Sequence, residues 1–316
     1  MTMVWSDYRV CVTGGAGFLG RVVRKQLLER GVLPGSIIVP RRPEYDLTNE
    51  RDVRRLYQRE RPDVVLHLAA EVGGIGANMT NPGRFFYANM AMGLHLVEQA
   101  RLAGIRKFVH VSTVCAYPKL TEVPFKEADL WNGYPEDTNA PYGIAKKALI
   151  VMLDAYHRQY GLNSAVVIPT NLYGPGDNFD PNTSHVIPAL IRKFSQAQLN
   201  NEKHVVCWGT GRASREFLHV NDAAAGVILA AEIMEVPLPI NLGTGREVSI
   251  ADLAYAIARL CDYSGEIIWD STKPDGQPRR CLNTAVATAL LGWQANTPFI
   301  EGLTKTIAWW RSSQSL

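Results

Sequence analysis

A tyrosine and a lysine four residues apart carry the clearest chemistry in this sequence. Tyr142 and Lys146 stand at the start of an apolar-periodic stretch, and residues i and i+4 are neighbours on one face of a helix. A phenol has a pKa near ~10, and a nearby ammonium favours the phenolate and lowers that pKa. We therefore expect Tyr142 to exchange a proton with a carbinol oxygen of a substrate, and Lys146 to lower the pKa of Tyr142.

A glycine-rich loop near the N-terminus supplies the second signal. Gly14, Gly17 and Gly20 follow a short apolar run and open a helical pattern, and Phe18 and Leu19 of the same loop are further expected cofactor residues. Glycines allow a tight turn and let the backbone approach a pyrophosphate. The N-terminus of the following helix adds amide donors and a favourable dipole. The loop therefore predicts a dinucleotide-binding site.

The residues after the second predicted strand indicate which dinucleotide is bound. A site that prefers NAD usually carries Asp or Glu there, to accept a hydrogen bond from the ribose 2′-hydroxyl. This sequence has Arg41 and Arg42 instead, and two arginines suit a 2′-phosphate, with ordinary loop arginines as the alternative. We predict NADP(H) rather than NAD(H), with Asp46 and Leu47 at the edge of the adenine.

A hydroxyl at the end of a later predicted strand would complete the reactive set. The run Phe108–Ser112 leads into Thr113, and open α/β sheets hold ligands at the carboxyl ends of their strands. A hydroxyl there can hydrogen-bond the reacting oxygen, so Ser112 or Thr113 is the expected third member beside Tyr142. Lys146 would in addition hold the nicotinamide ribose.

Short apolar runs alternate with longer amphipathic stretches through the first half of the chain. This alternation predicts an α/β fold with a Rossmann-like doubly wound parallel sheet, and continuous apolar strands indicate a sheet covered on both faces. The predicted strands are Arg9–Thr13, Ser36–Val39, Val64–Leu68, Phe108–Ser112 and Ser164–Ile168. The predicted helices are Arg21–Glu29, Glu50–Glu60, Gly83–Ala103 and Tyr142–Tyr160.

The pattern changes after Pro175, where Gly, Asp, Asn and Pro mark a loop. We expect residues 1–173 to form the cofactor-binding domain and residues 174–316 a smaller α+β substrate domain. A strand–helix unit, Glu216–Val220 and Asp222–Glu232, leaves open whether the segment 216–243 returns to the main sheet. The other predicted elements are strands Val205–Trp208 and Glu266–Trp269 and helices Val186–Ala197, Ile250–Leu260, Thr284–Leu291 and Phe299–Trp310.

The composition is that of an ordinary globular chain, with 316 residues, 47% hydrophobic residues and a formal charge of +3. That charge is too small to argue for nucleic acid, and helical spacing in the Arg-rich run 51–61 indicates a solvated helix face, with a nucleic-acid patch as the alternative. Five cysteines without a CxxC argue against disulfide frameworks and zinc sites. No signal peptide is apparent, and no apolar run reaches the ~18 residues that a membrane span requires. We expect a cytoplasmic protein with no metal, nucleic-acid or membrane partner.

Several further segments resemble the extended short-chain dehydrogenase/reductase family over nearly the whole chain, and in particular its GDP-L-fucose synthase branch. The spacing of Tyr142 and Lys146 marks the superfamily alone, whereas Cys-x-Tyr-Pro-Lys and Ser-His-Val-Ile-Pro-Ala-Leu are more specific to the branch. The segments that carry the resemblance are His67–Ile75, Cys115–Lys119, Pro141–Lys146, Pro169–Pro175, Asn182–Leu190, Arg215–Val220 and Lys273–Gly276.

The resemblance implies a two-part reaction at one site. A GDP-4-keto-6-deoxy-mannose would be epimerised at C3 and C5, which flank the C4 ketone and therefore carry acidic protons, and NADPH would then reduce the ketone to give GDP-L-fucose. The family's epimerisation residues fall on Cys115 and His185, and its hydroxyl falls on Thr113. Cysteine at ~8.5 and histidine at ~6.5 suit an acid and a base that work near neutral pH.

The resemblance also implies binding residues. Cofactor contacts would come from Leu68, Ala69, Ala70 and His185, and Asn171 would touch the substrate near the nicotinamide. A guanine can stack on an indole and arginines suit a diphosphate, with core packing as the alternative for the indole. The residues that would line the nucleotide-sugar pocket are Val186, Leu190, Lys193, Trp208, Arg215 and Arg280.

Two other functions stay open at this point. One is a related nucleotide-sugar 4-epimerase, reductase or dehydratase acting on another GDP-sugar. The other is a non-catalytic dinucleotide-binding protein, which would be expected to have a broken tyrosine, lysine and hydroxyl set, whereas the set is whole here.

A homodimer is expected by family analogy. The stretches Gly83–Ala103 and Tyr142–Tyr160 carry large apolar side chains that could form a four-helix interface, with packing in the protein's own core as the alternative. These side chains are Phe85, Phe86, Met90, Met92, Leu149, Met152, Leu153 and Tyr156.

Overall fold

Six parallel strands form the main sheet of the computed structural model, which describes residues 3–181, 183–273 and 275–314. Their order across the sheet is β2-β1-β3-β4-β5-β9. The strands are β1 (Val10–Thr13), β2 (Ile37–Ile38), β3 (Val64–His67), β4 (Lys107–Val111), β5 (Ser164–Pro169) and β9 (Pro239–Leu242). Strands β1, β3, β4 and β5 are buried along their whole length, as expected for a sheet covered on both faces.

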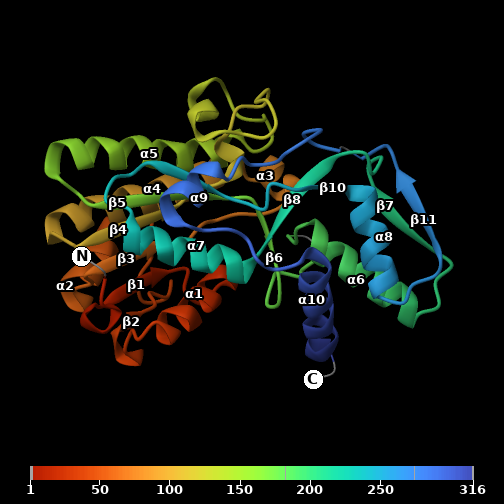
Figure 1. Cartoon of the computed structure of the whole chain (residues 1–316), viewed down its shortest axis with the longest axis horizontal. Helices are drawn as coiled ribbons and strands as arrows, with labels where there is room; N and C mark the ends of the chain where they lie inside the picture. Colours follow the sequence, from red (N-terminus) through yellow and green to blue (C-terminus); the bar gives the residue numbers. More distant parts are fainter. Residues whose placement is uncertain (1–2, 182, 274, 315–316) are drawn as a thin grey trace.

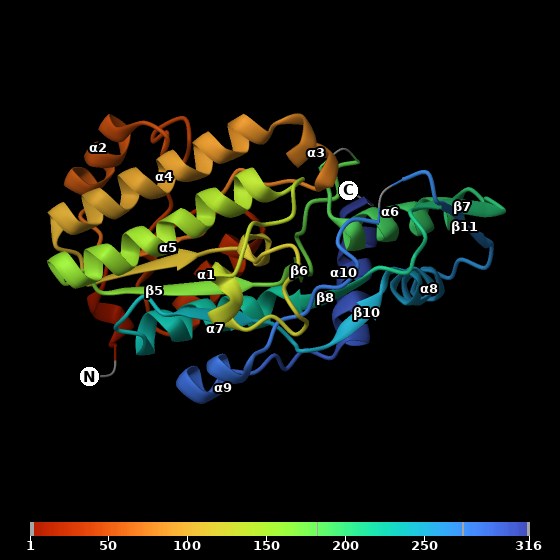
Figure 2. The same ribbon diagram turned by 90° about the horizontal axis from the view of Figure 1, so that it is seen from above.

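Helices cover the two faces of this sheet, which lies between them as the middle layer (Figure 2). One face packs against α1 (Phe18–Glu29), α7 (Val220–Ile233) and α9 (Ala285–Leu291). The other packs against α2 (Glu50–Glu60), α4 (Pro82–Ala103) and α5 (Ala140–Tyr160). Both long helices end at a glycine in the left-handed conformation, Gly104 (φ 62°) after α4 and Gly161 (φ 68°) after α5.

A smaller lobe lies beside the carboxyl ends of the main strands (Figure 1). It contains a sheet of order β10-β8-β6 and a parallel pair of β7 with β11, surrounded by helices. Its strands are β6 (Asn171–Tyr173), β7 (His204–Trp208), β8 (Ser214–His219), β10 (Glu247–Ser249) and β11 (Glu266–Asp270), and its helices are α6 (Val186–Leu199), α8 (Ile250–Leu260) and α10 (Phe299–Gln314). Phe194, Ile257 and Leu303 are among the residues of its separate apolar core.

The predicted helices agree closely with the structure, while the strands show two differences. Strand β2 contains two residues rather than four. The segment 216–243 is divided: β8 pairs with β6 and β10 in the small lobe, whereas α7 and β9 belong to the main sheet. The short helix α3 (Ile75–Thr80) and strands β6, β9 and β10 were not predicted as separate elements.

A buried carboxylate ties the two lobes together. Glu216 on β8 is fully buried, and its carboxylate accepts hydrogen bonds from the backbone N–H groups of Thr244 (2.5 Å), Gly245 (2.6 Å) and Leu282 (2.9 Å). These donors follow β9 of the main sheet and precede α9. The Glu216 side chain therefore joins β8 to two other segments where the lobes meet.

Replacing Glu216 by Ala should lower the free energy of unfolding by about 3 kcal/mol, since three N–H donors lose their acceptor and a cavity opens. Urea unfolding measures the change. Glu50→Ala removes a carboxylate from an exposed pair with Arg54 and should cost less than about 1 kcal/mol. Equal costs for the two substitutions would contradict the role assigned to Glu216.

Candidate active site

A single cavity of about 1030 Å³ brings all the predicted site residues together. Its floor is the carboxyl end of the main sheet, and its far wall is the small lobe. The predicted cofactor residues that line it are Gly14, Gly17, Phe18, Leu19, Gly20, Arg41, Arg42, Asp46, Leu47, Leu68, Ala69 and Ala70. The other predicted residues that line it are Thr113, Cys115, Tyr142, Lys146, Asn171, His185, Val186, Leu190, Lys193, Trp208, Arg215 and Arg280.

The glycine loop has the shape that a dinucleotide needs. Gly14 adopts φ 69°, and the Gly17 N–H donates to the Gly14 carbonyl at 2.8 Å. A Cβ on Gly20 would lie 2.2 Å from that carbonyl oxygen, so the turn and α1 pack together with no side chain between them. Gly17 is the N-cap of α1 and offers no side-chain cap, which leaves amide donors at the helix start for a phosphate. The residues present therefore fit a dinucleotide.

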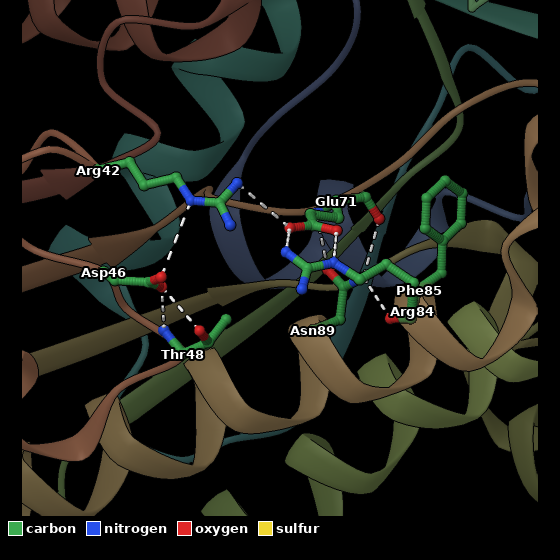
Figure 3. Close-up of polar contacts among 7 residues, drawn as sticks. All are labelled: Arg42, Asp46, Thr48, Glu71, Arg84, Phe85 and Asn89. Atoms are coloured by element: carbon green, nitrogen blue, oxygen red, sulfur yellow. Dashed lines mark hydrogen bonds and ion pairs between the residues drawn. The ribbon is translucent and has the colours of Figure 1, made fainter.

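Arg42 sits in a network of charged groups at one end of the cavity, between Asp46 and Glu71 (Figure 3). Its nearest contacts to both carboxylates are 3.8 Å, and its side chain is 67% exposed. Asp46 accepts hydrogen bonds from the N–H and hydroxyl of Thr48, and these bonds lower the pKa of Asp46. Glu71 is already engaged by Arg84 at 2.7 Å. Arg42 is thus held loosely enough to turn towards a 2′-phosphate.

The tyrosine, lysine and hydroxyl set lies at the carboxyl end of β4 and the start of α5. The Thr113 hydroxyl hydrogen-bonds Tyr142, and Lys146 is 1% exposed one turn further along α5. The predicted effect of Lys146 on Tyr142 is wrong for this structure: burial, followed by the Cys115 charge, raises the pKa of Tyr142. Burial also lowers the pKa of Lys146 to about 7. Loss of hydration is the largest cause of both shifts.

Two buried histidines lie beneath this set. His67 contacts the Thr13 hydroxyl at 2.9 Å, and the Nε2 of His110 lies 3.2 Å from the backbone carbonyl of Lys146. The two rings are stacked with centroids 5.9 Å apart. Burial, together with the Lys146 charge, lowers the pKa of both histidines, so both remain neutral, and His110 anchors the backbone of α5 without adding charge.

Cys115 lies in the 3₁₀ turn η3 (Val114–Ala116) that follows β4. Its backbone N–H bonds the Thr113 hydroxyl, and a Cβ on Gly143 would lie 2.3 Å from its carbonyl oxygen, so α5 packs directly on this turn. The Tyr117 hydroxyl donates to Asn241 on β9 at 2.7 Å and ties the same turn to the edge of the sheet. Cys115 is partly exposed to the cavity, while the other four cysteines are buried.

His185 reaches the cavity from the other lobe. It occupies the N-cap position of α6 and makes no side-chain cap bond there. His185 is exposed and lines the cavity, and desolvation by the surrounding protein lowers the pKa of its ring. Asn182, in the preceding loop, and Pro274, in the last of the segments behind the resemblance, lie outside the described residues.

The predicted substrate residues line the wall formed by the small lobe. Trp208 is 64% exposed with Lys273 at 5.6 Å from its ring centroid, so it is not a core residue. Lys193 donates to the Val206 carbonyl at 2.9 Å, and Asn171 donates to the Glu216 carbonyl at 2.9 Å.

Sequence reasoning missed several polar residues of the cavity, including Glu71, Glu136, Asp177 and Gln277. Burial raises the pKa of Asp177 to about 7, and its backbone N–H is bonded to Gly174. Its place in a Gly-Asp-Asn run marked a loop but gave no sign of burial. Within the described residues no group of side chains suits a metal ion, and no helix there is both long and apolar enough to cross a membrane.

Comparison with known proteins gives one family. The profile of the NAD dependent epimerase/dehydratase family matches residues 10–243. The GDP-L-fucose synthase of Escherichia coli K12 is 41% identical over 318 residues, covering 98% of each chain.

Solved structures of related proteins superpose over almost the whole chain. A GDP-L-fucose synthetase from Naegleria fowleri bound to NADP has a TM-score of 0.89 and 26% identity, and the match covers 100% of this chain and 97% of that one. A GDP-6-OMe-4-keto-L-xylo-heptose reductase from Campylobacter jejuni has a TM-score of 0.90 and 27% identity, with 96% and 97% covered.

Replacing Lys146 by Met should change the pH dependence of stability. The folded-state pKa of Lys146 is about 7 and the unfolded value is near ~10.4, so between these values the unfolded state binds a proton that the folded state lacks. Wild-type stability should therefore gain about 1.4 kcal/mol per pH unit from this residue across that window, and Lys146→Met should lose the gain.

Urea unfolding from pH 6 to pH 10 measures both curves. Lys25→Met, at an exposed position on α1, is the control and should follow wild type. Parallel curves for Lys146→Met and wild type would show that burial of Lys146 does not control its protonation.

Proposed function

The chain belongs to the NAD dependent epimerase/dehydratase family, and we propose that it is a bifunctional epimerase-reductase that makes GDP-L-fucose. Its substrate is GDP-4-keto-6-deoxy-D-mannose, which it epimerises at C3 and C5 and reduces at C4 with NADPH. The observation that carries this proposal is that Cys115 and His185 line the same cavity as Thr113, Tyr142 and Lys146. The near full-length similarity to the Escherichia coli GDP-L-fucose synthase supports it.

Epimerisation needs a base on one face of the sugar ring and an acid on the other. Cys115 approaches from the turn after β4, and His185 approaches from the start of α6 in the opposite lobe. The Cys115 sulfur takes the proton from the carbon beside the ketone, and His185 returns a proton from the other side. The lowered pKa of His185 makes its protonated form a stronger acid.

Reduction takes place at C4, where NADPH supplies the hydride when bound. The glycine loop, Arg41 and Arg42 would hold the cofactor, with Lys146 on the nicotinamide ribose. The raised pKa of Tyr142 keeps its phenol protonated at neutral pH, so Tyr142 donates a proton to the C4 oxygen. The Thr113 hydroxyl, bonded to that phenol, orients it.

Arg215 supports a nucleoside diphosphate substrate. Burial, together with Arg280, lowers the pKa of Arg215 to about 10, which leaves Arg215 charged at neutral pH and facing the cavity. A guanidinium in this setting suits a diphosphate.

A GDP-sugar reductase with another sugar is the second candidate. The similarity to the Campylobacter jejuni heptose reductase favours it, because that structure matches as well as the synthetase does. Such an enzyme would share the reduction machinery, and the two candidates differ in whether C3 and C5 are epimerised on GDP-4-keto-6-deoxy-mannose.

The deciding experiment supplies GDP-4-keto-6-deoxy-mannose and NADPH in deuterated water. Wild type should incorporate deuterium at C3 and C5 and consume NADPH. Cys115→Ser should lose exchange while still binding NADPH, and Tyr142→Phe should keep exchange while NADPH consumption falls by about 10²–10⁴-fold. Tyr134→Phe, at an exposed tyrosine, is the control. NADPH consumption without exchange would favour a reductase, and neither activity would reject both candidates.

We further propose a homodimer formed through α4 and α5. Of the side chains predicted for the interface, Phe85, Met92, Leu149 and Leu153 are buried within the chain itself. Phe86 remains exposed, as do Leu94 on α4 and Val151 on α5, and these apolar side chains suit a helical interface.

A cytoplasmic location is proposed as well, and the unpaired state of all five cysteines supports it.

A double substitution, Leu94→Glu with Val151→Glu, should convert the dimer to a monomer near 35.0 kDa, because it places charges at the proposed contact. Sedimentation velocity measures the change. Leu28→Glu, on α1 at the opposite face of the sheet, should leave the dimer intact. A wild-type monomer would reject the proposal.

A further inference from the structure

Arg280 contacts the sulfur of Cys115. The Nη1 of Arg280 lies 3.6 Å from Cys115 Sγ, and the arginine is 8% exposed. An arginine so deeply buried needs partners for its N–H groups and its charge. The sulfur is one of them.

Gln277 fixes the other edge of the guanidinium. Its Oε1 accepts from Nε (3.2 Å) and Nη2 (3.0 Å) of Arg280, and its Nε2 donates to the Lys119 carbonyl at 3.0 Å. Lys119 belongs to the Cys-x-Tyr-Pro-Lys segment that begins at Cys115. Arg280 is therefore held against the same loop that carries the Cys115 sulfur, and these bonds fix the orientation of its guanidinium group.

The charges around the sulfur leave a positive excess. Arg215, beside Arg280, donates to the backbone carbonyls of Ser214 (2.7 Å) and Asp275 (3.1 Å). Among the described residues neither arginine has a carboxylate within ion-pair distance, and the Asp275 carboxylate is bonded to Thr210. Two adjacent guanidiniums, Arg280 buried and Arg215 half-buried, repel each other unless an anion lies near both.

Titratable and charged groups from several neighbouring elements interact with Cys115. Tyr142 comes from α5, Arg215 from β8, and Arg280 from the segment before α9. Glu136, in the loop before α5, interacts with Arg215 rather than pairing with Arg280. The charged side chain that contacts the sulfur is thus a positive one.

We propose that Arg280 is a positioning residue that holds Cys115 in its thiolate form, and that Gln277 keeps Arg280 in place for this role. The inference rests on the proposed function in one respect, namely that the thiolate is the form of Cys115 that removes a proton from the sugar. Arg215 is left to face the diphosphate. The two arginines accordingly have different roles, although both line the nucleotide-sugar cavity.

The test is the pH dependence of Cys115 alkylation by iodoacetamide, because the thiolate is the reactive form. Mass spectrometry of the modified site separates Cys115 from the four buried cysteines. A guanidinium in contact with the sulfur stabilises the thiolate over the thiol. Arg280→Met should therefore slow alkylation at pH 7 about tenfold and displace the pH profile upwards.

Two further variants sharpen the comparison. Arg279→Met removes the neighbouring arginine, which is exposed and paired with Glu247, and should keep the wild-type profile. Gln277→Leu leaves the arginine in place without its support and should give a smaller upward shift than Arg280→Met. It carries the test alone if Arg280→Met does not fold, as judged by thermal melting and NADPH binding.

An unchanged alkylation profile in both Arg280→Met and Gln277→Leu would overturn the proposal. Weaker binding of GDP by the same variants would make Arg280 a diphosphate ligand instead. Failure of the proposed function would look different. In that case the alkylation profile would shift as expected, while Cys115→Ser would still exchange deuterium into the sugar.

Discussion

The close approach of α5 to the turn after β4 is the constraint on which the active site depends. Gly143 makes it possible, since any side chain there would strike the Cys115 carbonyl oxygen. With that contact in place, the phenol of Tyr142, the amine of Lys146 and the hydroxyl of Thr113 meet on one side of the turn, and the thiol faces the same cavity. Burial follows from the same packing and sets the protonation of Tyr142 and Lys146.

Most of the helices and the residues that line the cavity could be predicted from the sequence, because the patterns that indicate them are local. Helices with a periodic apolar face and a terminal glycine, such as Pro82–Ala103, can be predicted with their ends from a few turns of sequence. The glycine loop and the paired arginines are short motifs whose geometry is set by neighbouring residues. Every residue predicted for the site lines the cavity, since strand ends in a parallel sheet gather at one edge.

What the sequence could not provide depends on contacts between distant segments. The sequence predicts a lowered pKa for Tyr142, because the spacing of Tyr142 and Lys146 is visible in the motif. The pKa is raised instead, because the loss of hydration at Tyr142 depends on the whole fold. The division between β8 and β9 is set by pairing partners far along the chain. Arg280 lies 165 residues beyond Cys115 along the chain. No local sequence pattern joins Arg280 or Gln277 to Cys115.

The pairing of β9 with β5 has a consequence for the synthesis of the protein on the ribosome. Most of the small lobe's strands and α6 are synthesised before Pro239–Leu242 emerges, so the emerging chain carries a β5 with one open edge and an apolar sheet face that α7 has not yet covered. Open strand edges invite pairing with other chains. Translation speed between β5 and β9 therefore sets how long the nascent sheet is exposed to aggregation, and chaperone capture has its natural window there.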